Sequence, residues 1–182
     1  GSRHYAASDF PDRIVASPAQ DASGGFAVAW RTAPLAQPAL LEITVAGDSP
    51  DMGQVRQLTA SSQLLQTENG SSQHHRALID GLQADTLYAY RVQGQGTWSA
   101  WQHFRTAAAA GQSLTVLYFG DTQNKNLSHV SRVIRQGWQT APDARLTLFA
   151  GDLVSGGDGE DDNEWGEWFA AGGWLLPGMA VA

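Results

Sequence analysis

The sequence predicts two parts of different fold class: a two-sheet β-sandwich, followed by the beginning of an α/β domain with the order β-α-β-α. Seven short runs rich in β-forming residues precede residue 106, with turn signals between them and without helical periodicity. A run of small residues, 107–112, then forms a linker. After it, apolar runs alternate with segments of helical spacing, which is the pattern of a layered α/β domain.

The sandwich is placed at residues 11–106, because seven strands in so short a stretch argue for two packed sheets. The second run is the clearest: every other residue from Phe26 to Trp30 is large and apolar, and the two between them are alanines. The predicted strands are Arg13–Ser17, Gly25–Arg31, Leu40–Val45, Arg56–Ala60, Gln73–Ile79, Thr86–Val92 and Thr97–Arg105.

The α/β part is placed at residues 113–182. Its first strand is continuously apolar, as expected for a strand that is covered on both faces. The helix after it carries Val130, Val133, Ile134 and Trp138 at helical spacing. The predicted elements are the strand Leu114–Phe119, the helix Ser128–Gln139, the strand Arg145–Ala150, the helix Asn163–Ala170 and a third apolar run, Met179–Ala182.

The second helix of this part is predicted to place Trp165, Trp168 and Phe169 on one face. Asp161 and Glu164 have the spacing of a capping box at its start. The acidic residues around this start are interpreted as a solvated loop and first turn, since their spacing does not match an EF-hand. They are Asp158, Glu160, Asp161, Asp162 and Glu164.

Composition excludes several classes of function. The 182 residues are 42% hydrophobic and carry a formal net charge of −7, and no Lys/Arg cluster appears, so neither nucleic acid nor an anionic membrane surface is an expected partner. The absence of cysteine excludes disulfides, thiolate nucleophiles and Cys-based metal sites. No run approaches the ~18 apolar residues of a membrane-spanning helix.

Two Gly-Asp pairs are the candidate metal-binding residues of the sequence. Gly120-Asp121 closes the first apolar strand of the α/β part, and Gly151-Asp152 closes the second. Parallel strands would bring both carboxylates to the edge of the sheet at which α/β proteins bind ligands. Such carboxylates suit hard, oxygen-preferring cations or a two-metal site. The alternative is that both are ordinary turns after buried strands.

Other polar and aromatic residues are given structural roles. His74 and His75 are adjacent and point to opposite faces of a strand, so they do not easily share a metal. His129 is placed on the helix surface. Trp98 and Trp101 are expected on opposite faces, one in the core and one against a neighbouring domain.

The segment Leu82–Val92 resembles the tyrosine-corner strand of fibronectin type III domains, whose pattern is Leu-x-Pro-x-Thr-x-Tyr-x-Tyr-x-Val. Only the proline is missing, and Ala84 takes its place. The resemblance implies that Tyr88 is the corner tyrosine, with its hydroxyl bonded back to the chain. It also implies that Trp30 is the core tryptophan of the second strand.

The segments Phe119–Gln123 and Phe149–Gly156 resemble the first two signatures of calcineurin-like metallophosphoesterases. Within these, the purple acid phosphatases also place a fibronectin-like domain ahead of the catalytic domain. The resemblance implies that Asp121 binds one of two metal ions (Fe, Zn or Mn) and that Asp152 bridges both. It implies hydrolysis of phosphate esters by a metal-bound water, in a secreted or periplasmic protein.

Two residues depart from the purple acid phosphatase pattern. Gln123 stands where many metallophosphoesterases have His and purple acid phosphatases have Gly. Ser155 stands where purple acid phosphatases have an iron-binding Tyr, so a purple iron–tyrosinate centre is not expected. Either residue is a candidate metal ligand or a support for one.

The remaining ligands of the family, an Asn and several His, are expected beyond Ala182, in a longer parent protein. The 182-residue chain alone is therefore expected to bind no metal tightly, to be inactive, and to self-associate through an exposed edge of its unfinished sheet. Two alternatives stay open. One is a non-catalytic surface or carbohydrate-associated sandwich module, and the other is a nucleotidase or pyrophosphatase of the same superfamily.

Overall fold

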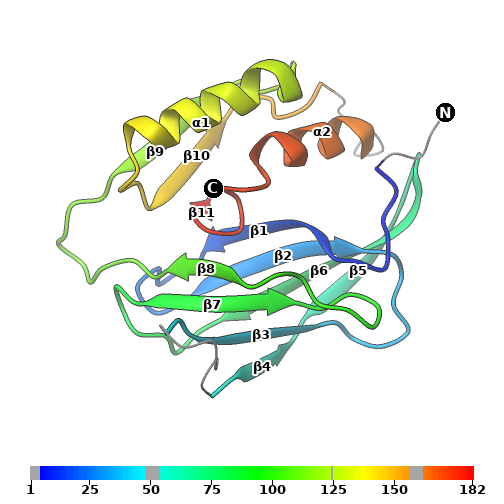
Figure 1. Ribbon diagram of the computed structural model, residues 1–182, viewed down its shortest axis with the longest axis horizontal. Helices are drawn as coiled ribbons and strands as arrows, with labels where there is room; N and C mark the ends of the chain where they lie inside the picture. Colours follow the sequence, from blue (N-terminus) through cyan, green and yellow to red (C-terminus); the bar gives the residue numbers. More distant parts are fainter. Residues whose placement is uncertain (1–4, 48–53, 124, 156–161) are drawn as a thin grey trace.

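The computed structural model describes residues 5–47, 54–123, 125–155 and 162–182 (Figure 1). Within them, eight strands form a sandwich of two antiparallel sheets, with the orders β1-β2-β6-β5 and β4-β3-β7-β8. The strands are β1 (Asp12–Pro18), β2 (Phe26–Thr32), β3 (Leu40–Val45), β4 (Arg56–Thr59), β5 (Ser61–Thr67), β6 (Gly70–Ile79), β7 (Leu87–Val92) and β8 (Gln102–Arg105).

Strand β5 is absent from the sequence-based assignment. Its residues are mostly Ser, Gln and Thr, its two leucines are adjacent, and nearly all of it is exposed, so no apolar alternation marks it. It forms because Ser61–Thr67 pairs in register with β6, from Ser61 opposite Arg76 to Thr67 opposite Gly70. The strand predicted at Thr97–Arg105 is also shorter, since only Gln102–Arg105 is regular and Trp98 makes one isolated bridge to Gln93.

The inner faces of the two sheets form the core that the alternation in β2 predicts. Phe26 and Trp30 are at most 2% exposed, and the Phe26 ring stacks on Phe104 with centroids 3.9 Å apart. Trp30 Nε1 donates to the carbonyl of Gln93 at 3.0 Å. The Tyr88 hydroxyl accepts a hydrogen bond of 2.8 Å from the backbone N–H of Gln83, which is the geometry of a tyrosine corner.

The α/β part has a three-stranded parallel sheet of order β11-β10-β9, with helices on one side of it (Figure 1). Leu117 and Phe119 pack against Val130 and Ile134, and Gly137 lets the Phe119 ring approach the helix closely. The elements are β9 (Val116–Gly120), a π-helical turn η1 (Asn126–Val130), α1 (Ser131–Thr140), β10 (Leu146–Ala150), α2 (Asp162–Gly172) and β11 (Ala180–Val181).

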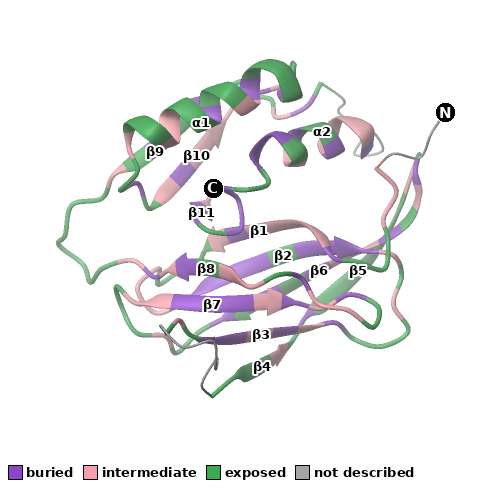
Figure 2. Cartoon of the chain, in the orientation of Figure 1, coloured by how far each residue is buried: buried purple, intermediate pink, exposed green. Residues whose placement is uncertain are grey.

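The first strand of this part is not covered on both faces, contrary to the prediction. Burial alternates along β9, with Val116 38% and Tyr118 67% exposed (Figure 2). Val133 of α1 is also exposed, although its spacing placed it on the apolar face. The reason is that the helices cover one face of the sheet, so a continuous apolar run alone cannot show whether a second layer is present.

The two parts share one continuous interface. The segment after α2 lies along strand β1 of the sandwich, where the Leu176 carbonyl accepts a hydrogen bond of 2.9 Å from Ala16 N. The Tyr90 hydroxyl donates to Pro177 O at 2.5 Å, and its complete burial raises the Tyr90 pKa. Leu146 and Ala180 pack onto the sandwich core. An apolar, hydrogen-bonded interface of this kind favours a fixed arrangement of the two parts.

Among the described residues, no helix is long and apolar enough to cross a membrane.

Candidate metal centre

The two Gly-Asp turns lie side by side at the carboxyl ends of β9 and β10. The strands are parallel and in register, with Gly120 opposite Ala150, so both chains leave the sheet at the same level. Asp121 N donates to Ala150 O at 2.7 Å. A Cβ atom on Gly151 would stand 3.2 Å from Asp121 N, so the backbones of the two turns are in contact. The structure therefore places the two Gly-Asp turns that the sequence singled out side by side.

Both turns need unusual backbone conformations. Asp121 has φ 48°, in the left-handed region that aspartate tolerates better than most residues. Gly151 has φ 87°, where any side chain would be strained, and its missing Cβ leaves the space that the Asp121 backbone occupies. Glycine at position 151 is thus favoured on two grounds, whereas a Cβ atom on Gly120 would meet only Ala150 O at 3.9 Å, an ordinary contact.

The carboxylates of Asp121 and Asp152 are exposed to solvent at this edge. The Gln123 side chain donates from Nε2 to Asp121 Oδ1 at 3.0 Å, so Gln123 holds one carboxylate oxygen in place. Ser155 Oγ lies 3.5 Å from the carbonyl of Gln123, at the limit of a hydrogen bond. Gln123 and Ser155 therefore lie at the same edge as the two aspartates.

Helix α2 supports both turns through contacts that sequence reasoning missed. Trp168 Nε1 donates to Thr122 Oγ1 at 3.0 Å, and both side chains are buried. Glu164 Oε2 accepts from the backbone N–H of Ser155 at 2.6 Å. The sequence offered one signal, a tryptophan and a glutamate four residues apart on the predicted helix, but it could not name their partners.

The donor set of the described residues is small. No three His, Cys, Asp or Glu side chains gather in them in a way that could hold a metal ion. His129 is exposed on η1, with Ser128 Oγ 3.1 Å from its Nδ1. Two carboxylates alone are too few ligands for a dinuclear centre, but their exposure and chemistry suit part of one.

His75 belongs to the sandwich core. It is 2% exposed, its ring lies tilted against Trp30 with centroids 5.3 Å apart, and it contacts Thr32 Oγ1 at 2.7 Å and Ser62 Oγ at 2.6 Å. Burial, and secondarily the charge of His74, lower its pKa to about 4. Both ring nitrogens are therefore occupied by structural hydrogen bonds.

The acidic segment before α2 differs from the prediction in one residue. Asp162 was expected in solvent, but it is only 4% exposed and forms ion pairs with Arg13 at 2.6 Å and Arg31 at 3.2 Å. Burial alone would raise its pKa, but the hydrogen bonds from Asn69 and Arg13 and both arginine charges outweigh burial and keep it below its ordinary value. Asp158, Glu160 and Asp161, with the predicted capping box, lie outside the described residues.

The two tryptophans near β8 also differ from expectation. Trp98 and Trp101 are both half-buried, and neither lies in the core. The guanidinium of Arg91 lies 4.5 Å from the Trp98 ring centre and 4.8 Å from that of Trp101. Both rings therefore gather around one cation, because cation–π contact of this kind is favourable at a partly exposed site.

Residues 11–106, more than half of the chain, match the family described as "Purple acid Phosphatase, N-terminal domain". The chain belongs to the purple acid phosphatase N-terminal domain family. This is the family type that the tyrosine corner and the two Gly-Asp signatures indicated. No curated protein matches the chain in a sequence comparison.

Solved structures of purple acid phosphatase PPD1 from yellow lupin (Lupinus luteus) and of PhoD resemble the chain across both parts. PPD1 is 17% identical with a TM-score of 0.72, over 96% of this chain and 34% of that one. PhoD is 12% identical with a TM-score of 0.59, over 92% of this chain and 36% of that one. These similarities confirm the predicted fold class, a sandwich followed by the start of an α/β domain. The chain spans about a third of the length of either structure.

Proposed function

We propose that this chain supplies the sandwich and the first two metal-binding carboxylates of a two-metal phosphoesterase. The observation that carries the proposal is the contact between the two Gly-Asp turns at the carboxyl ends of β9 and β10. Membership of the purple acid phosphatase family supports a phosphoesterase over a non-catalytic adhesion or carbohydrate-associated module.

Asp121 would bind one metal ion and Asp152 would bridge two. A bridging carboxylate is needed because two dications held close together repel strongly. When bound, such a pair of ions lowers the pKa of a shared water and clamps a phosphate group, which is the chemistry of phosphate-ester hydrolysis. Within this chain, Gln123 orients Asp121 by donating to Oδ1.

The metals proposed are Fe, Zn or Mn. Ser155 has a hydroxyl where the purple enzymes have an iron-binding tyrosine, so the proposal does not include a purple centre. The substrate proposed is a phosphate ester, and a substrate panel of phosphomonoesters, nucleotides and pyrophosphate on the parent protein would separate a phosphatase from a nucleotidase or pyrophosphatase. A secreted or periplasmic location is proposed from the family resemblance alone.

A titration with Mn²⁺ on the ¹⁵N-labelled chain tests the carboxylate site. Because two carboxylates are weak ligands, we expect no tight two-metal binding in calorimetry and no phosphatase activity from the 182-residue chain. We expect Mn²⁺ to broaden the amide signals of Gly120–Gln123 and Gly151–Leu153 first, since the metal relaxes nearby nuclei most.

Asp121→Asn and Asp152→Asn should each abolish that selective broadening. Asp143→Asn is the matched control, because Asp143 is another exposed carboxylate of the α/β part, held by Thr115 Oγ1 at 3.0 Å. Broadening that spreads evenly over the acidic surface, or that survives in both aspartate variants, would refute the proposed site.

A further inference from the structure

One end of helix α2 is fixed to the sandwich by buried charged and polar groups. Asp162 accepts hydrogen bonds from Arg13 Nη1 at 2.6 Å, Arg31 Nη1 at 3.2 Å and Asn69 Nδ2 at 2.9 Å. The side chains of both arginines and of Asp162 are at most 8% exposed. Separating the helix from the sandwich would leave charges unpaired, which is costly for buried ions. We call Asp12, Arg13, Arg31, Asn69 and Asp162 the anchor cluster.

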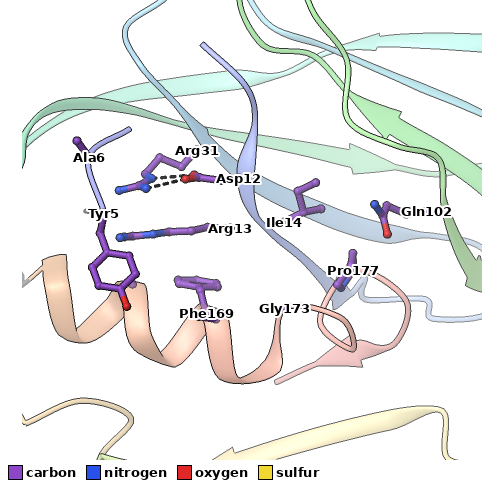
Figure 3. A pocket seen from close by; sticks show the side chains of 12 residues that line it. Tyr5, Ala6, Asp12, Arg13, Ile14, Arg31, Gln102, Phe169, Gly173 and Pro177 are labelled. Carbon is purple, nitrogen blue, oxygen red and sulfur yellow. Dashed lines mark hydrogen bonds and ion pairs between the residues drawn. The ribbon is translucent and has the colours of Figure 1, made fainter. Parts of the chain in front are cut away.

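Strand β1 is shaped for this contact. Its pairing with β2 is shifted between Asp12 and Val15, and Arg13 has φ 50°, so a β-bulge turns the Arg13 side chain toward α2. Figure 3 shows Arg13 lying between the strand and the helix beside Phe169, and the Arg13 Cζ atom is 5.6 Å from that ring centre. Arg31 completes a two-bond ion pair with Asp12 at 2.7 and 2.8 Å (Figure 3).

The anchor cluster borders a cavity of about 330 Å³ between the sandwich and α2. On the helix side of this cavity, the Tyr5 ring rests directly against Gly166, where any Cβ atom would overlap it. The N-terminal segment therefore also packs onto α2 at a position one turn beyond Asp162. Strand β1, its preceding segment and α2 form one packed unit.

Helix α2 presents a second face to the carboxylate turns. Residues spaced by three or four positions share a face of a helix. Because the helix is rigid, a contact that fixes one face also fixes the position of the other. The sandwich face of α2 consists of Asp162, Gly166 and Phe169, and the turn face of Glu164, Trp168 and Ala171.

The turn face contacts both carboxylate turns, which we define as Gly120–Gln123 and Gly151–Ser155. Trp168 donates to Thr122, the residue directly after Asp121, at 3.0 Å. Glu164 accepts from the amide of Ser155, three residues after Asp152, at 2.6 Å. Each turn is thus held by one side chain of the same helix, and that helix is held by the sandwich.

We infer that the sandwich positions the two carboxylate turns through α2, with Asp162, Glu164 and Trp168 as positioning residues. This inference deepens the proposed function, because it concerns the turns to which metal binding is assigned. The sandwich then contributes to the geometry of the metal site, because the anchor cluster fixes the position of α2 and α2 fixes the positions of the two turns.

Hydrogen exchange in the metal-free 182-residue chain tests the coupling. Two protons report directly on the turns: the indole Nε1–H of Trp168 and the amide N–H of Ser155. Asp162→Asn keeps the side-chain shape and removes the charge, and we expect both protons to exchange about tenfold faster or more, as local opening of α2 becomes easier. The strands β2 and β6 should keep their exchange rates.

Asp80→Asn is the matched control, because Asp80 pairs with Arg56 in an exposed ion pair of the sandwich away from α2. It should change neither reporter. Faster exchange of the α2 amides in Asp162→Asn, with unchanged rates for the Trp168 indole and the Ser155 amide, would overturn the inference.

If Asp162→Asn prevents folding, Asn69→Ala provides the same test more mildly, since it removes the hydrogen bonds from Asn69 to Asp162 and Asn163 and leaves both ion pairs. Both reporters should then exchange about threefold faster, and unchanged rates would again overturn the coupling.

The Mn²⁺ titration is a separate measurement. Faster exchange of both reporters without selective broadening by Mn²⁺ would refute the metal site but support the coupling. Selective broadening with unchanged exchange of both reporters would support the metal site but refute the coupling.

Discussion

The indole Nε1–H of Trp168 donates to Thr122 Oγ1 at 3.0 Å, and both side chains are at most 6% exposed. The hydroxyl belongs to the residue directly after Asp121, so a helix that follows the second Gly-Asp turn holds the loop of the first. The Trp168 ring also packs edge-on against Phe149 of β10, with centroids 5.1 Å apart. One aromatic side chain therefore joins α2 to the loop after β9 and to strand β10.

Removal of the Thr122 hydroxyl should destabilise the α/β part. Thr122→Val keeps the shape but leaves the buried indole N–H without its acceptor, which costs about 1–3 kcal/mol. Thr122→Ser keeps the hydroxyl and should recover most of this loss. Urea unfolding followed by tryptophan fluorescence measures both variants, and equal stabilities for Val and Ser would show that the hydrogen bond contributes nothing.

Alanine at position 151 should be more harmful than alanine at another left-handed glycine. Gly151→Ala places a Cβ atom 3.2 Å from Asp121 N at φ 87°, so the strain of the backbone, about 1–2 kcal/mol, adds to a steric contact. Gly111 has φ 97° with open space around it and supplies the matched control, Gly111→Ala. Urea unfolding should show the larger loss for Gly151→Ala. Equal losses would mean that the two turns can separate without cost.

Folding stability should fall as the pH decreases from about 6.5 toward about 4, through the titration of His75. Its folded pKa is lowered to about 4, below the ordinary value of 6.5, so the unfolded chain binds more protons in this window. Because protons favour the state that binds more of them, acidification favours unfolding, by as much as about 3 kcal/mol for this group.

A histidine ring NMR titration would measure the His75 pKa directly, and urea unfolding between pH 4 and 7 would measure the loss of stability. An ordinary pKa for His75 would contradict this prediction.

The exposed side of β9 should mediate weak self-association of this chain. Val116 and Tyr118 are 38% and 67% exposed, and β9 ends the order of strands in its sheet within the described residues. An unprotected apolar strand edge favours pairing with a second copy. Sizing at increasing concentration should show association that Tyr118→Lys abolishes. Leu78→Lys is the control and should not affect it, because Leu78 is 54% exposed but lies on β6, which has a neighbouring strand on each side. A monomer at all concentrations would contradict the prediction.

Much of the fold follows from short-range pattern. Alternation in β2 and the tyrosine-corner strand each predict both the backbone conformation and the face that is buried. The helical spacing in α1 predicted the helix, but it placed the exposed Val133 on the buried face. The pairing of the two Gly-Asp turns was predictable for the same reason, since each turn follows a strand and parallel strands end at a common edge. Position in the chain was enough to infer that the two turns lie side by side.

The tertiary structure decided what local pattern cannot express. Strand β5 has no apolar alternation and forms because its backbone pairs with β6 through antiparallel hydrogen bonds. Tyr118 lies in an apolar run yet is exposed, because burial depends on which layers are present. Asp162 looks like a surface acid beside a loop, but Arg13 and Arg31, more than a hundred residues earlier, enclose it.

The sequence by itself therefore determined the two fold classes, their order and the two carboxylates at one sheet edge. Only the tertiary structure decided that α2 holds these carboxylate turns and is itself held by buried charges of the sandwich. The physical reason is that a hydrophobic period is a property of neighbouring residues, whereas an ion pair such as Arg13 with Asp162 depends on segments that meet only after folding.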